Sequence, residues 1–141
     1  MNYTNEMKIK FERMEDVTKA MPVVVDAFKS LSIYESYTNE TMKRVLNDLS
    51  VKDNLIILGD GLEGYFDPED SRKVFETVFT KLAETLTLID FLAEAGNLGS
   101  YSSSKITAQF VNGSFKLQNE YWSGLDEDGD SELNEVDKYF F

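Results

Sequence analysis

One long apolar stripe constrains the fold of this chain more than any other feature. The segment Asp67-Pro68-Glu69-Asp70 is typical of a helix start, with a capping side chain, proline in the first turn and acids near the positive end of the helix dipole. Apolar residues then recur at helical spacing, namely Phe75, Val78, Phe79, Leu82, Leu86, Ile89, Phe91 and Leu92. The spacing predicts a helix from Pro68 to Ala95, ended by Gly96.

The N-terminal half predicts one strand and two helices. Met7, Ile9 and Phe11 alternate with charged residues, which is the period of a half-buried strand. A helical stripe follows at Val17, Met21, Val24, Phe28 and Leu31. Pro22 lies inside this stripe, so it either kinks the helix or opens a second one as its first residue. A second, shorter stripe predicts a helix over residues 39–50.

Two hairpins complete the expected elements. The segments 106–110 and 114–122 alternate on either side of Asn112-Gly113, a dipeptide typical of a tight hairpin turn. The apolar run 54–58 is predicted to pair with 62–66 across the intervening glycines. Serine-rich residues 97–105 are predicted to be a flexible loop.

Length and composition place these elements in one domain. A chain of 141 residues has the size of a single domain, and its 42% apolar content with eighteen aromatic residues (ten Phe, seven Tyr, one Trp) indicates a packed core. We therefore expect an α+β domain over residues 1–141, in which an antiparallel sheet, formed by the N-terminal strand and two hairpins, packs on one long helix and shorter N-terminal helices. An acidic C-terminal segment, 126–137, follows the last hairpin.

The missing residue types and the net charge exclude several functions. Cysteine and histidine do not occur, which removes thiol nucleophiles, Ser-His-Asp arrangements and thiolate or imidazole metal sites. No signal peptide or membrane-spanning run is recognisable, so a cytoplasmic protein is expected. The net charge of −12 argues against direct binding of nucleic acid or an anionic membrane and favours a basic partner.

The negative charge is concentrated at the C-terminal end. Residues 1–116 hold 18 acids and 13 bases, a net −5, whereas residues 117–141 hold 8 acids and 1 base, a net −7. Within this end, residues 126–137 read DEDGDSELNEVD, which is seven carboxylates in twelve positions. We consider three interpretations of this segment: a metal site, a surface for a basic partner, and a solvated tail that supplies turns and a helix cap.

The segment 126–137 resembles the twelve-residue calcium loop of EF-hand and dockerin proteins. The resemblance implies a calcium ion held by Asp126, Asp128, Asp130, Glu132, Asn134 and Asp137, which stand at loop positions 1, 3, 5, 7, 9 and 12. Ser131 stands where the pattern has glycine, and a side chain in that left-handed turn costs roughly 1–2 kcal/mol. No second loop is present, and a strand is expected where the entering helix would lie.

The second interpretation is a protein-binding surface. Closely spaced carboxylates can imitate a run of phosphates and occupy the cationic groove of a nucleic-acid-handling enzyme. The carboxylates would be Asp126, Glu127, Asp128, Asp130, Glu132, Glu135 and Asp137, with Tyr121 and Trp122 as an apolar contact. Phage anti-CRISPR and anti-restriction proteins are similarly short, acidic and free of cysteine, which is a likeness of class. No spacing of residues selects a catalytic group, so we expect a binding or inhibitor protein that is not an enzyme and requires no cofactor, with calcium as the alternative ligand.

Overall fold

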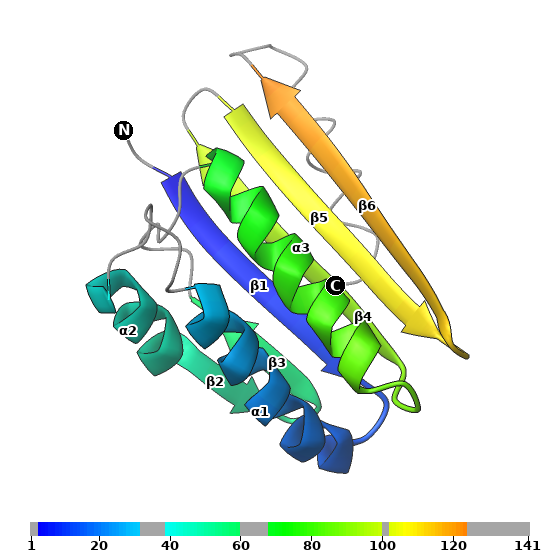
Figure 1. Cartoon of the computed structure of the whole chain (residues 1–141). Helices are drawn as coiled ribbons and strands as arrows, with labels where there is room; N and C mark the ends of the chain where they lie inside the picture. Colours follow the sequence, from blue (N-terminus) through cyan, green and yellow to red (C-terminus); the bar gives the residue numbers. More distant parts are fainter. Residues whose placement is uncertain (1–2, 32–38, 60–67, 100–101, 124–141) are drawn as a thin grey trace.

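A computed structural model of the chain describes residues 3–31, 39–59, 68–99 and 102–123, and there three helices lie on one face of a six-stranded antiparallel sheet (Figure 1). In chain order the elements are β1 (Tyr3–Phe11), α1 (Met14–Leu31), α2 (Asn39–Asp48), β2 (Leu49–Lys52), β3 (Leu55–Leu58), α3 (Pro68–Thr85), β4 (Phe91–Gly99), β5 (Ser102–Val111) and β6 (Ser114–Ser123). The expected α+β class is confirmed. None of these helices is both long enough and apolar enough to cross a membrane.

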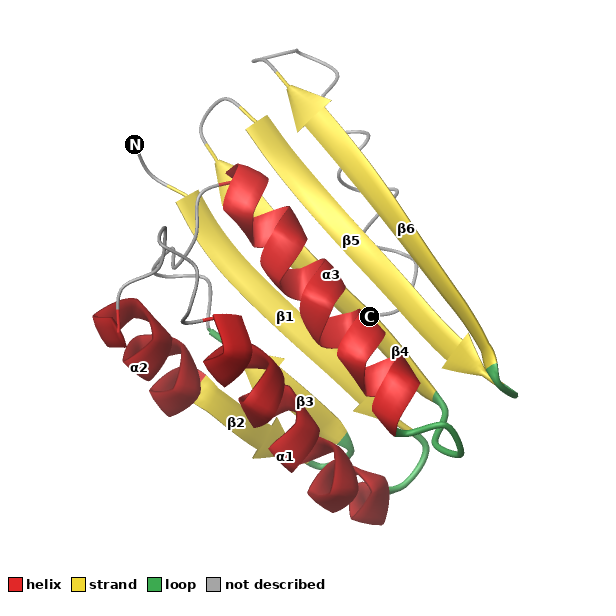
Figure 2. Ribbon diagram, in the orientation of Figure 1, coloured by secondary structure: helices red, strands yellow, loops and turns green. Residues whose placement is uncertain are grey.

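The sheet has the strand order β2-β3-β1-β4-β5-β6, and every neighbouring pair is antiparallel (Figure 2). β1 is a central strand, because β3 pairs with one of its edges and β4 with the other. α1 lies over β1 and β3, and α3 lies over β4 and β5. The sheet therefore has one face covered by helices and one face that no described helix covers.

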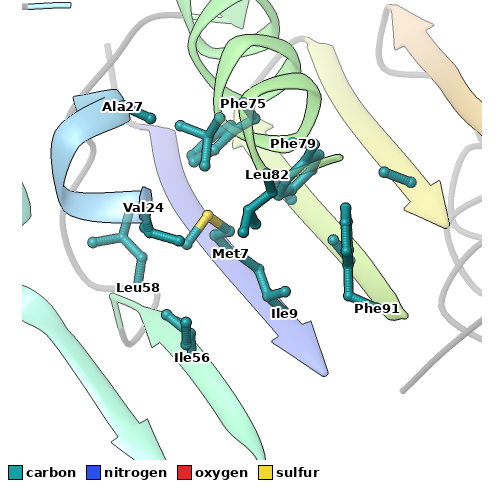
Figure 3. Packing of buried hydrophobic residues seen from close by; sticks show 14 of the residues in the cluster. Met7, Ile9, Val24, Ala27, Ile56, Leu58, Phe75, Phe79, Leu82 and Phe91 are labelled. Carbon is teal, nitrogen blue, oxygen red and sulfur yellow. The ribbon is translucent and has the colours of Figure 1, made fainter. Parts of the chain in front are cut away.

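The core lies between the helices and the sheet (Figure 3). Met7, Ile9 and Phe11 of β1 are buried, as the two-residue period predicts, and Phe75 and Phe79 of α3 are fully buried above them. Aromatic rings continue the core along the sheet, since the ring centroids of Phe11 and Phe91 are 6.3 Å apart and those of Phe91 and Phe110 are 5.9 Å apart. Burial of these apolar side chains is the main stabilising contribution to the fold.

α1 is one continuous helix through Pro22, which decides between the two alternatives for that residue. Proline cannot donate a hydrogen bond to the preceding turn, and here its side chain is exposed on the face away from the core. The start of α1 is fixed by Arg13, whose carbonyl accepts the amide of Asp16 at 3.1 Å and whose guanidinium lies 3.3 Å from the Asp16 carboxylate. The apolar side chains that α1 buries include Val17, Val24 and Phe28.

The long helix is shorter than predicted. α3 begins at Pro68, as expected, but ends at Thr85, and residues 91–99 form β4 instead of continuing the helix to Ala95. Phe91, Ala93 and Ala95 are buried at a two-residue period, and β4 pairs along its length with β1 and β5. The apolar residues at 91 and 92 fit both the helical period and the strand period. Hydrogen bonding of this segment to β1 on one side and to β5 on the other favours the strand.

The predicted pairing of 54–58 with 62–66 is also wrong. β3 is a strand, but its two edges are taken by β2 and β1, so no edge remains for 62–66, which itself lies outside the described residues. The helix expected over 39–50 ends at Asp48, and Leu49 begins β2.

The turn between β2 and β3 is tied to the end of β1. It contains Asp53 at a φ of 54°, and the Asn54 carbonyl accepts a hydrogen bond from the Phe11 amide at 3.0 Å.

The serine-rich segment is part of the sheet. β4 extends to Gly99 and β5 begins at Ser102, so the loop predicted over 97–105 is wrong for the residues described there. Backbone pairing with β1, β4 and β6 satisfies the amides of this polar stretch and outweighs its low strand propensity.

The second hairpin is confirmed. Asn112 and Gly113 have φ values of 51° and 80°, as a two-residue type I′ turn requires. The Asp90 carboxylate accepts the amide of Asn112 at 3.1 Å and joins this turn to the α3–β4 connection. In the middle of β6, Asn119 donates a hydrogen bond to Glu76 of α3 at 2.6 Å.

Candidate functional site

Most of the predicted site residues lie outside the described residues. This holds for the whole segment 126–137, and so for the predicted calcium ligands and for the predicted carboxylates of the partner surface. Both sets remain predictions. In the described ranges, no three acidic side chains come together in a way that could hold a metal ion.

Tyr121 and Trp122 lie near the end of β6, the last strand at one side of the sheet. Their backbones pair with Ser104 and Ser103 of β5. β6 ends at Ser123, three residues before Asp126. The two aromatic residues therefore belong to the strand that precedes the acidic segment in the sequence, and the partner-surface hypothesis remains a prediction.

The strand register divides the sheet residues between two faces. Residues in register with Ile9, such as Ile56, Ala93 and Ala108, are buried toward the helices. Their neighbours along each strand point to the opposite side, because successive side chains alternate. We call this second side the outer face.

Lysine dominates the charge of the outer face. Its ionisable side chains, among the residues whose side chains are described, are Lys8, Lys10, Lys52, Lys105, Lys116, Glu6 and Glu94. Five lysines and two glutamates give a net +3, on a chain whose net charge is −12. The positive face is a feature that sequence reasoning missed, and its only local signal is the alternation of Lys8 and Lys10 with apolar residues in β1.

The centre of the outer face is an ion pair in a shielded position. The Lys105 ammonium lies 3.2 Å from the Glu94 carboxylate, and these side chains are only 11% and 13% exposed. Thr107, beside Glu94 in the register, is 6% exposed. Leu55, Ile57 and Leu92 add half-buried apolar surface around the lysines. The outer face thus combines positive charge with apolar contact area, which suits an acidic polypeptide that carries apolar residues.

A second described surface is an apolar groove beside α1. It has a volume of about 620 Å³ and is lined mainly by Met14, Val17, Met21, Pro22, Val25 and Val51. Met14 and Val51 are 66% and 51% exposed. The groove is open to solvent, and its acidic lining residues, Asp26 and Asp53, come from different elements. An apolar side chain of a partner could insert there. The described lining residues do not include a nucleophile with a neighbouring general base, so the groove does not have the arrangement of a catalytic site.

Comparison of the chain with protein-family models, with curated proteins and with solved structures found no match in any of the three. The functional argument therefore rests on the residues and on their arrangement.

Proposed function

We propose that this protein is a non-enzymatic binding protein whose acidic segment, 126–137, docks on a basic protein surface. The observation that carries the proposal is the density of seven carboxylates in twelve residues, directly beyond the strand that holds Tyr121 and Trp122. The carboxylates provide charge complementarity, and the two aromatic residues provide apolar contact area. The proposed target is the cationic groove of a nucleic-acid-handling enzyme, and inhibition follows because the segment occupies the nucleic-acid path.

The position of β6 supports this function. Among the described strands β6 pairs only with β5, so the chain leaves the sheet at its edge and not from its centre. A segment that begins at an edge can reach a partner without displacing a strand. The rigid part of the domain, anchored by the buried aromatic core, would then serve as a support for the acidic segment.

The test is binding to a panel of basic nucleases, measured as association rate over a range of salt concentrations. The variant Asp126→Asn/Asp128→Asn/Asp130→Asn removes three charges from the segment. Its control, Glu12→Gln/Asp26→Asn/Glu84→Gln, removes three exposed charges elsewhere. We expect the first variant to slow association by about tenfold, the lower end of electrostatic steering, and the control to bind like the unmodified chain. Binding that is indifferent to both salt and the segment charges would disprove the proposal.

The alternative function is calcium binding by the same segment, and the matching ligand positions favour it. Because Ser131 replaces the loop glycine, we expect weak binding, with a Kd of roughly 10⁻⁴–10⁻³ M. Calorimetry with calcium and with magnesium tests this, using Asp128→Ala as the variant and Asp26→Ala as the control. Heat that disappears only in Asp128→Ala would support the metal site, and absence of heat at millimolar calcium removes it.

A further inference from the structure

We propose that the outer face of the sheet is the docking surface for the chain's own acidic segment, 126–137. This contact is intramolecular and goes beyond the proposed function, on which it does not depend. It pairs a face whose described ionisable side chains sum to +3 with a segment that holds seven carboxylates and no base.

The charge complementarity is specific to this face. Lys8 and Lys10 from β1, Lys105 from β5 and Lys116 from β6 lie on one side of the sheet although they are far apart in the sequence. Lys10 and Lys116 are exposed, and Lys8 is half-buried. Opposite charges on two parts of one molecule attract over about 10 Å at ordinary ionic strength.

The length of the chain permits the contact. Neighbouring strands lie about 4.8 Å apart, so β1, three strands away from β6, is only roughly 14 Å from it. Twelve extended residues span up to roughly 40 Å, which is enough to cross from β6 past Lys105 to Lys8. Because the segment begins three residues beyond Ser123, its effective concentration at the face is in the millimolar range.

A nucleic acid fits the outer face less well than the acidic segment does. Acidic residues outnumber basic residues in the whole chain, and the resulting net charge of −12 repels a polyanion at long range. The acidic segment is already attached, so it meets no such barrier to encounter. We therefore assign the face to residues 126–137.

Paramagnetic broadening in NMR spectra of the full chain tests the proposal. The chain has no cysteine, so Ser131→Cys provides a single site for a nitroxide label. In the presence of EDTA, which excludes a calcium effect, we expect selective loss of methyl signals from Leu55, Ile57 and Leu92 on the outer face. The methyl signals of Val25, which lies on α1 at the opposite side, should keep most of their intensity.

Two changes should abolish this broadening. One is salt at about 1 M, where the Debye length is about 3 Å. The other is Lys8→Gln/Lys10→Gln/Lys116→Gln, introduced into the labelled chain. The matched control, Lys19→Gln/Lys73→Gln/Lys81→Gln, removes the same charge from exposed helix positions and should leave the broadening intact. The salt series needs no lysine variant and gives a result even if the outer-face variant does not fold.

The proposal is overturned if the outer-face methyl signals are not broadened at low salt, or if broadening persists in the outer-face variant. A mixture of spin-labelled chain and isotope-labelled chain without nitroxide distinguishes the occupant. Broadening in the mixture would assign the face to the segment of a second copy and reject the intramolecular contact. Stoichiometric binding of a single-stranded oligonucleotide at the same methyl groups would assign the face to nucleic acid and reject it as well.

Discussion

At the scale of single residues, the buried aromatic side chains carry much of the stability. Phe79 of α3 is fully buried and lies in the centre of the core, beside Phe75, with ring centroids 6.4 Å apart. Leu88, in the connection after α3, is 96% exposed although it is equally apolar. The two residues show that hydrophobicity alone does not assign a side chain to the core.

We expect Phe79→Ala to lower the free energy of unfolding by about 3–5 kcal/mol, because it removes buried area and leaves a cavity. The control, Leu88→Ala, should change it by less than about 0.5 kcal/mol. Urea unfolding followed by circular dichroism measures both. Equal effects of the two substitutions would contradict the position of α3 over the sheet.

The outer-face lysines show what could be read from individual residues and what could not. The alternation of Met7, Ile9 and Phe11 with lysines correctly predicts that Lys8 and Lys10 share a solvent-side face of β1. That Lys105 and Lys116 join this face depends on the pairing of β1 with β4, whose partner residues are 80 to 96 positions apart in the sequence. Such pairing leaves no local trace, so the charged face is visible only once the register is known.

At the scale of elements, local signals succeeded where one period dominated. The start of α3 at Pro68, the turn at Asn112-Gly113 and the helix through Val17 and Phe28 follow from capping, turn chemistry and helical spacing. β4 was missed because its apolar residues continue the helical stripe of α3. β2 was missed because four residues at the end of a helix are too short for a period to emerge.

Hydrogen exchange should rank the strands by their position in the sheet. We expect the amides of β1 and β4, which have partners on both sides, to exchange most slowly, and those of the outermost strands β2 and β6 to exchange fastest. NMR exchange measurements on the intact protein give these rates. Fast exchange over residues 91–95, or the chemical shifts of a helix there, would contradict the assignment of β4.

At the scale of the whole molecule, charge is separated along the chain and across the sheet. The sequence of segment 126–137 is strongly negative, whereas the described side chains of the outer face are positive in sum, so the net charge of −12 is an average over regions of opposite sign. If the two proposals hold together, a basic partner must displace the acidic segment from the outer face before it binds. The apparent affinity of the partner for the whole protein is then lower than the intrinsic affinity of the partner for the released segment.

The central position of β1 has a consequence for biosynthesis. In the completed sheet Tyr3 pairs with Gly99 and Phe11 with Phe91, which are 96 and 80 positions later in the chain. β1 is therefore synthesised 80 to 96 residues before its neighbour on that side. Long-range antiparallel pairing of this kind slows acquisition of the native state and leaves an apolar strand open to chaperones in the meantime.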